Sequence, residues 1–233
     1  MTEVGDLYRL FLEPTQRTRC LHKWHHYFSV YERFIAPFRG RRVTLLEIGV
    51  QQGGSLELWR AYLGPAARIV GIDVDPACAA HGAADTQVFI GDQADPAFLR
   101  RVLAEVGPPD LVIDDGGHTA NQQITAFETI YPVLPVPGVY LVEDTHTALW
   151  GGAYADRPDG QSILDFAFQR CRALHDWTVQ REAFGRYGTP PTDRREPAPP
   201  VSDFCRRTGA ISFFDSIVVF ERADRHEPWH EVR

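Results

Sequence analysis

Apolar runs and helix-like patterns alternate along the middle of this chain. Short runs of Val, Ile and Leu bounded by turn residues are typical of strands buried in a parallel sheet. Between them, apolar residues recur three and four positions apart, which predicts helices. We therefore expect strands at about 43–48, 68–73, 87–91, 110–114 and 137–142, with helices at about 54–63, 76–81, 95–105 and 119–131. This alternation predicts an α/β fold with a mostly parallel, doubly wound sheet and helices on both faces.

The two ends of the chain differ from this core. Residues 7–38 are predicted to be helical, because aromatic residues recur there at helical spacing, namely Trp24, Tyr27, Phe28, Tyr31 and Phe34. After the core, a helix is expected at 161–174, and 177–184 is either a strand or an extension. β character returns at 211–214 and 217–220, which predicts an antiparallel strand at the sheet edge.

The last third of the chain also contains a proline-rich stretch. Residues 185–203 combine many prolines with few apolar side chains, which predicts a mobile loop. The expected organisation is a helical segment at 1–40, one domain at 41–222 that includes this loop, and a polar tail at 223–233. The loop is either a substrate lid or a passive linker.

The charge balance narrows the class of partner. The 233 residues carry a formal net charge of −7, which argues against a general nucleic-acid or anionic-membrane binder, because phosphate surfaces require a basic face. We expect a small-molecule partner. The four cysteines form no C-x-x-C pair, which predicts reduced thiols in a cytoplasmic protein. The first residues lack the pattern of a secretory signal.

Acidic residues follow two neighbouring apolar runs. Asp114-Asp115-Gly116-Gly117-His118 closes one run, and Glu143-Asp144 closes the next. Ligands of open α/β sheets bind just outside the carboxyl ends of the strands, and carboxylates gathered there favour a hard divalent cation. The structural alternative is a turn in which the first two acids cap the helix that begins near Thr119. We favour the metal site, because two strands end in acids.

A glycine turn follows the first strand. Glu47-Ile48-Gly49 leads into Gly53-Gly54-Ser55, where glycine lets a ligand approach the backbone closely. The spacing fails the G-x-G-x-x-G pattern of dinucleotide enzymes. It resembles the first motif of class I methyltransferases that use S-adenosylmethionine (SAM), where an acid precedes the first glycine. The next two strands end in Asp73, placed to accept both ribose hydroxyls, and in Gly91-Asp92-Gln93, suited to adenine.

Together these blocks resemble the metal-dependent sugar O-methyltransferases of macrolide and related antibiotic pathways, which are Rossmann-like class I methyltransferases. The likeness runs from about residue 20 to 222, and the matching segments are 45–50, 53–56, 71–73, 91–93, 113–118 and 143–145. Two positions depart from the family. Gly117 stands where a Ser or similar residue is usual, and His22 replaces an Asp before Lys23. Longer relatives have an additional N-terminal domain, whose substrate contacts are not carried over.

The resemblance implies a reaction and a set of roles. Asp115, Glu143 and Asp144 would ligate Mg²⁺, and His118 would act beside Asp115 as general base on a sugar hydroxyl. A metal-bound hydroxyl is more acidic, and a positioned imidazole contributes roughly 10²–10⁴-fold in rate. The residues expected to contact SAM are Glu47, Gly49, Gly53, Ser55, Asp73, Asp92, Gln93 and Asp114. The substrate would be a small-molecule glycoside, and the enzyme a homo-oligomer.

Other functions stay open at this point. A catechol-type methyltransferase is a close rival, because a vicinal aromatic diol also chelates a metal. An NAD-dependent oxidoreductase would also place a ribose-binding acid at Asp73, and a catalytically silent SAM-binding protein would need no metal ligands. His146 and Trp150 either contact the substrate or pack locally. We interpret a histidine cluster as part of an amphipathic helix face rather than a metal site; its members are His22, His25 and His26.

Overall fold

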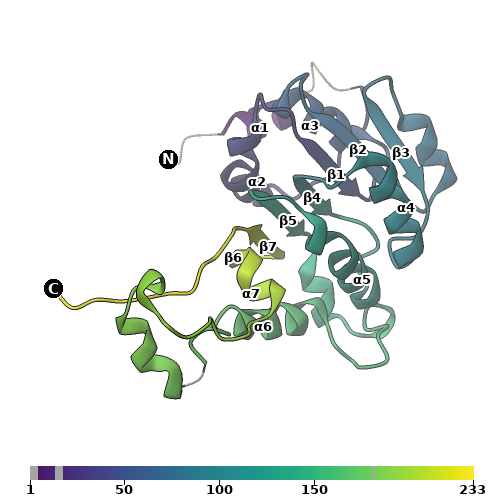
Figure 1. Ribbon diagram of the computed structural model, residues 1–233. Helices are drawn as coiled ribbons and strands as arrows, with labels where there is room; N and C mark the ends of the chain where they lie inside the picture. The colour runs from purple at the N-terminus through teal and green to yellow at the C-terminus, as the bar shows by residue number, and fades with distance from the viewer. Residues whose placement is uncertain (1–4, 14–17, 180) are drawn as a thin grey trace.

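The computed structural model describes residues 5–13, 18–179 and 181–233 (Figure 1). Its centre is a seven-stranded sheet in the order β3-β2-β1-β4-β5-β7-β6. The parallel strands are β1 (Thr44–Ile48), β2 (Arg68–Asp73), β3 (Thr86–Ile90), β4 (Leu111–Asp114) and β5 (Gly138–Val142). At one edge, β7 (Ile217–Arg222) pairs antiparallel with both β5 and β6 (Thr208–Phe214). The predicted mostly parallel sheet with an antiparallel edge is confirmed.

Helices cover both faces of this sheet. Side chains alternate between faces along a strand, so Leu45 packs into one hydrophobic cluster and Leu46 into the other. The first cluster includes residues of α1 (Asp6–Leu12), α2 (Tyr27–Ile35) and α3 (Gly54–Leu63). The second includes residues of α4 (Pro96–Val106), α5 (Ala120–Ile130) and α6 (Ile163–Ala173). Within the described ranges, no helix is both long and apolar enough to span a bilayer.

The N-terminal region is not the single helix expected over 7–38. α1 ends at Leu12, and α2 begins only at Tyr27 and continues into the 3-10 turn η2 (Ala36–Phe38). Between them, residues 18 and 19 lie beside α3, because the Glu57 carboxylate accepts hydrogen bonds from the backbone N–H groups of Thr18 (2.7 Å) and Arg19 (3.2 Å). Residues 22–24, just before α2, lie at the carboxyl ends of the strands.

Several short connections are 3-10 helices. The helix expected at 76–81 is the 3-10 helix η3 (Pro76–His81), which Asp75 caps through a 2.9 Å hydrogen bond from Ala77 N. The other short helices along the chain are η4 (Tyr131–Val133), η5 (Thr145–Leu149), η6 (Gly152–Tyr154) and α7 (Asp203–Arg207).

The proline-rich region holds more structure than a loop. It contains the second half of η7 (Arg181–Gly188) and also η8 (Pro191–Asp193), whose proline is compatible with the first turn of a helix. The polar tail packs against it (Figure 1). The Glu227 carboxylate pairs with Arg186 (2.5 Å) and Arg194 (2.7 Å), so the tail and this region hold each other.

Candidate active site

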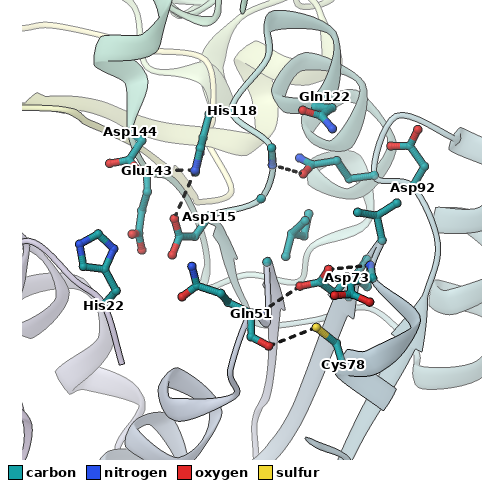
Figure 2. A pocket seen from close by; sticks show the side chains of 18 of the residues that line it. His22, Gln51, Asp73, Cys78, Asp92, Asp115, His118, Gln122, Glu143 and Asp144 are labelled. Carbon is teal, nitrogen blue, oxygen red and sulfur yellow. Dashed lines mark hydrogen bonds and ion pairs between the residues drawn. The ribbon is translucent and has the colours of Figure 1, made fainter. Parts of the chain in front are cut away.

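A cavity of about 590 Å³ opens at the carboxyl ends of β1, β2 and β4, the position at which open α/β sheets bind ligands. Its volume lies in the range of small-molecule sites. Figure 2 shows Asp73 and Asp92 on one side, with Asp115, His118 and Asp144 on the other. The strand register explains this gathering, because Ile48, Asp114 and Val142 are neighbours across β1, β4 and β5.

Gly49 forms the floor between the two sides of the cavity. Its φ of +93° lies in the left-handed region, which favours glycine. A Cβ at this position would overlap the backbone carbonyl oxygen of Asp115. The first glycine of the motif therefore allows the β1 turn to pack directly against the β4 turn.

A Gly49→Ala variant tests this close packing. We expect the free energy of unfolding to fall by roughly 3 kcal/mol or more, because a strained φ and an overpacked contact add up. Gly64→Ala is the matched control: its φ of +90° is similar, but a Cβ there meets no atom within 4 Å, so about 1 kcal/mol is expected. Denaturant unfolding of both variants measures the difference, and equal losses would contradict the packing role.

Asp73 holds the turn that follows β1. Its carboxylate accepts hydrogen bonds from the backbone N–H groups of Val50 (2.8 Å), Gln51 (2.9 Å) and Asp75 (2.9 Å). Burial opposes the charge, but these N–H groups outweigh it and lower the pKa of Asp73. A carboxylate has about four acceptor positions. With three occupied, Asp73 keeps an acceptor position for a ligand hydroxyl.

Of the predicted cofactor-binding residues, the structure brings Gly49, Asp73, Asp92 and Gln93 to the cavity wall. The other four do not line it, and they are Glu47, Gly53, Ser55 and Asp114. Glu47 is fully buried and accepts hydrogen bonds from Ser55 Oγ (2.6 Å) and Trp59 Nε1 (3.0 Å) of α3. Its expected cofactor contact has no support in this geometry.

Asp114 braces the β4 turn from inside. It is fully buried and accepts hydrogen bonds from Gln93 Nε2 (2.9 Å) and Tyr140 OH (3.0 Å). Gln93 Oε1 in turn accepts from Gly117 N (3.0 Å). Burial raises the pKa of Asp114 to about 7 against the opposing effect of these hydrogen bonds. This carboxyl group therefore fixes the turn, and it does not line the cavity.

Asp115, His118 and Asp144 form a cluster that could hold a metal ion. One ligand atom from each lies within 4.8 Å of the others. His118 Nε2 is 3.8 Å from Asp115 Oδ1 and 3.5 Å from Asp144 Oδ2. Both carboxylates are partly exposed to the cavity. Asp115, which follows β4, and Asp144, which lies beyond the end of β5, are thus brought together as the sequence pattern predicts.

Glu143 lies differently from the other two acids. It lines the cavity but is almost fully buried, and its oxygens accept hydrogen bonds from Lys23 Nζ (2.9 Å) and Tyr31 OH (2.7 Å). Burial and the charge of Asp115 raise its pKa, against the effect of Lys23 and Tyr31. In the described part of the chain it is outside the candidate ligand cluster, so direct ligation would require it to exchange one of these partners.

Lys23 is the cation of this site. Its ammonium group lies 2.5 Å from Asp115 Oδ2, 2.9 Å from Glu143 and 3.7 Å from Glu47. Burial alone would lower the pKa of Lys23, but the surrounding carboxylates outweigh this effect and raise it. Because the preceding residue, His22, departs from the related family, the sequence left the role of Lys23 open. Its spacing from Tyr27 and Tyr31 on the aromatic segment was the available signal.

Two site residues adopt the left-handed conformation, with φ of +58° at His118 and +52° at Asp144. Thr147 holds both. Its Oγ1 donates to the carbonyl oxygen of His118 (2.9 Å), and its backbone N–H donates to that of Asp144 (3.0 Å). Left-handed non-glycine residues cost energy and gather at functional sites. Thr147 therefore fixes the base candidate relative to the acid.

The sheet order and the cavity at the strand ends define a class I methyltransferase fold. A structure with the same fold is that of MycE, a methyltransferase of mycinamycin biosynthesis solved with Mg, SAH and mycinamycin VI. The two structures match with a TM-score of 0.73 and 23% sequence identity. The match covers 98% of this chain and 55% of MycE. No family model matches the chain.

Curated relatives make the likeness more specific. A tetracenomycin rhamnosyl 3'-O-methyltransferase of Streptomyces olivaceus is 37% identical over 80% of this chain and 50% of its own length. A tetracenomycin rhamnosyl 2'-O-methyltransferase of the same organism is 38% identical over 74% of this chain and 47% of its own length. The chain is thus similar to sugar O-methyltransferases of antibiotic pathways, as its motifs indicate, and spans about half the length of these relatives.

Proposed function

We propose that this chain is a SAM-dependent, Mg²⁺-dependent O-methyltransferase that methylates a sugar hydroxyl of a glycosylated natural product in antibiotic biosynthesis. The observation that carries the proposal is one continuous cavity that joins Asp73 and Asp92 to the cluster of Asp115, His118 and Asp144. The sugar acceptors named for the curated relatives support the substrate class. We further propose a cytoplasmic homo-oligomer whose only substrates are small molecules.

The donor set fits a hard dication. Asp115 and Asp144 offer carboxylate oxygens, the ligands that Mg²⁺ prefers. Three carboxylates surround Lys23, the single lysine of the chain, and they are Glu47, Asp115 and Glu143. A fourth, Asp144, lies beside His118. The carboxylates therefore outnumber the single ammonium group, which favours binding of a cation. Asp115 and Asp144 would hold it, and Glu143 would be a third ligand only after releasing Lys23 or Tyr31.

Different residues of the cavity have different roles in the proposed methyl transfer. When bound, Mg²⁺ would make a coordinated sugar hydroxyl more acidic and SAM would supply an activated methyl group. His118 Nε2, between the two carboxylates, is placed to take the proton of that hydroxyl. The negative charges of Asp115 and Asp144 then stabilise the imidazolium that forms. Gly49, Asp92 and Gln93 line the opposite side, where SAM would bind.

Aromatic side chains extend from the acidic side of the cavity to the surface. Trp24 lines the cavity, and its ring centroid lies 6.3 Å from that of His146. The row continues to Trp150, 5.0 Å from His146, and then to Tyr154, 5.1 Å from Trp150. Trp24 and Trp150 are more than half exposed. Exposed aromatic faces beside a polar cluster suit the apolar face of a sugar or its aglycone. We propose that this row binds the acceptor.

Trp150→Ala tests the acceptor role. We expect KM for the glycoside to rise about tenfold, equivalent to ~1.4 kcal/mol, because an apolar contact surface is lost, while KM for SAM stays unchanged. Trp229→Ala is the control, since Trp229 is also half exposed but lies in the tail. Steady-state kinetics with each substrate varied in turn measures both constants. An unchanged acceptor KM would mean that Trp150 only packs locally.

The proposed activity is tested by mass spectrometry of products. The protein is incubated with SAM and a panel of glycosylated antibiotics, with Mg²⁺ or with a chelator. A mass gain of one methyl group on the sugar, only with the metal, supports the proposal. Activity on catechols but not glycosides would select the catechol-type alternative, and calorimetric binding of NAD but not SAM would select an oxidoreductase. SAM binding without any turnover would indicate a silent binding protein.

A further inference from the structure

Three hydrogen-bond donors of the N-terminal region reach the acids of the candidate site. They are spaced four residues apart and are Lys23, Tyr27 and Tyr31. Lys23 Nζ contacts Asp115 Oδ2 at 2.5 Å and Glu143 at 2.9 Å. Tyr27 OH donates to Asp144 Oδ1 at 2.5 Å, and Tyr31 OH donates to Glu143 Oε1 at 2.7 Å. Tyr27 and Tyr31 share one stripe of α2, because residues four apart lie on the same helix face.

The contacts leave the two cluster carboxylates in matching orientations. In Asp115, Oδ2 accepts a hydrogen bond from Lys23, and Oδ1 is the oxygen nearest His118 Nε2. In Asp144, Oδ1 accepts a hydrogen bond from Tyr27, and Oδ2 is the oxygen nearest His118 Nε2. Each acid thus has one oxygen fixed by the N-terminal region and one turned toward the imidazole. A rotation of either carboxylate would break a hydrogen bond.

We propose that Lys23, Tyr27 and Tyr31 form a donor ladder that positions the acids of the dication site. The proposal rests on the proposed function and adds a task for the N-terminal region, that of preorganising the metal ligands. Hydrogen bonds from outside the ligand set orient carboxylates, and their loss typically costs 10–100-fold in metal affinity. The ladder also explains why α2 is packed against the sheet by its aromatic face, since Tyr27 and Tyr31 are buried.

Lys23 adds an electrostatic task to its hydrogen bonds. Without a cation of its own, a cluster of buried carboxylates repels itself and opens, because unpaired buried charges are costly. The ammonium of Lys23 touches three of these acids, Glu47, Asp115 and Glu143, but Asp144 is held by the neutral hydroxyl of Tyr27. The full charge of Asp144 therefore remains available to a dication.

The test is the affinity of the SAM-free protein for Mn²⁺, a spectroscopic substitute for Mg²⁺, measured by electron paramagnetic resonance. Tyr27→Phe removes one hydroxyl and keeps the ring. We expect Mn²⁺ affinity to fall about tenfold, with SAM affinity by calorimetry unchanged. Tyr62→Phe is the matched control, because Tyr62 OH also donates to a carboxylate, that of Glu32, at 2.5 Å, but outside the cavity. Melting temperatures of both variants monitor the fold.

Each outcome decides between the two proposals. Weaker Mn²⁺ binding by Tyr27→Phe alone supports the ladder. Equal Mn²⁺ affinity of Tyr27→Phe and the unaltered protein overturns the ladder and leaves the proposed function standing. An equal loss in Tyr62→Phe, or a parallel loss of SAM affinity in Tyr27→Phe, also overturns it, because the effect would then be general. Failure of the unaltered protein to bind Mn²⁺ overturns the metal-dependent function itself.

Discussion

Replacing Asp144 with Asn is expected to lower kcat by roughly 10³-fold, equivalent to ~4 kcal/mol. The change removes the negative charge that faces both His118 and the proposed cation, while keeping nearly the same shape. Asn is the suitable substitute because residue 144 has a φ of +52°, a conformation that Asn tolerates better than most residues. An Ala variant would add backbone strain to the loss of charge. Steady-state kinetics with saturating Mg²⁺ measures the effect.

Asp215→Asn is the control for this charge change. Asp215 is exposed and pairs only loosely with His26 at 3.8 Å, so its neutralisation should leave kcat within about twofold, as for most surface substitutions. Both variants should keep the melting temperature of the unaltered protein to within a few degrees. Undiminished turnover by Asp144→Asn would remove the metal from the mechanism.

The sheet could be predicted because each strand is a short apolar run between turn residues. The residues at the strand ends follow from the sheet itself, since parallel strands bring their carboxyl ends to one edge. This is why Asp115 and Asp144 meet, although they are 29 residues apart along the chain, and why His118 joins them three residues after Asp115. Local pattern and strand direction are sufficient for these residues.

Glu47 shows a difference between its motif position and its place in the structure, since it is buried and does not line the cavity. The residue precedes the first glycine as in SAM-binding motifs, but it lies inside β1 and points to the same face as Leu45, since side chains alternate along a strand. That face is covered by α3, whose Ser55 and Trp59 donate to the carboxylate. The period of two was visible in the sequence and argued against a cavity position.

The N-terminal contribution could not be predicted from local pattern. The aromatic spacing indicates a helix, but it does not show where the helix starts or that Lys23 lies just before it, among acids 92 and 120 residues away along the chain. Such contacts depend on how α2 packs on the finished sheet. The same limit applies to Glu227, which pairs with Arg186 and Arg194 across the tail.

Replacing His118 with Asn separates a base from a metal ligand. If His118 takes the proton of the acceptor hydroxyl, kcat should fall by roughly 10²–10⁴-fold, while Mn²⁺ affinity changes little, because hard dications prefer the oxygens of Asp115 and Asp144. Asn also tolerates the φ of +58° at this position. Binding of SAM should be unchanged, since Asp92 and Gln93 line the opposite side of the cavity.

His175→Asn, at an exposed position beyond α6, is the control for the loss of an imidazole and should retain full activity. The two measurements on His118→Asn lead to different conclusions. A large loss of Mn²⁺ affinity together with kcat would make His118 a ligand of the ion, as its place within 4.8 Å of both carboxylate oxygens permits. A normal kcat would assign proton removal to another group, and a slow enzyme that still binds Mn²⁺ and SAM normally identifies His118 as the base.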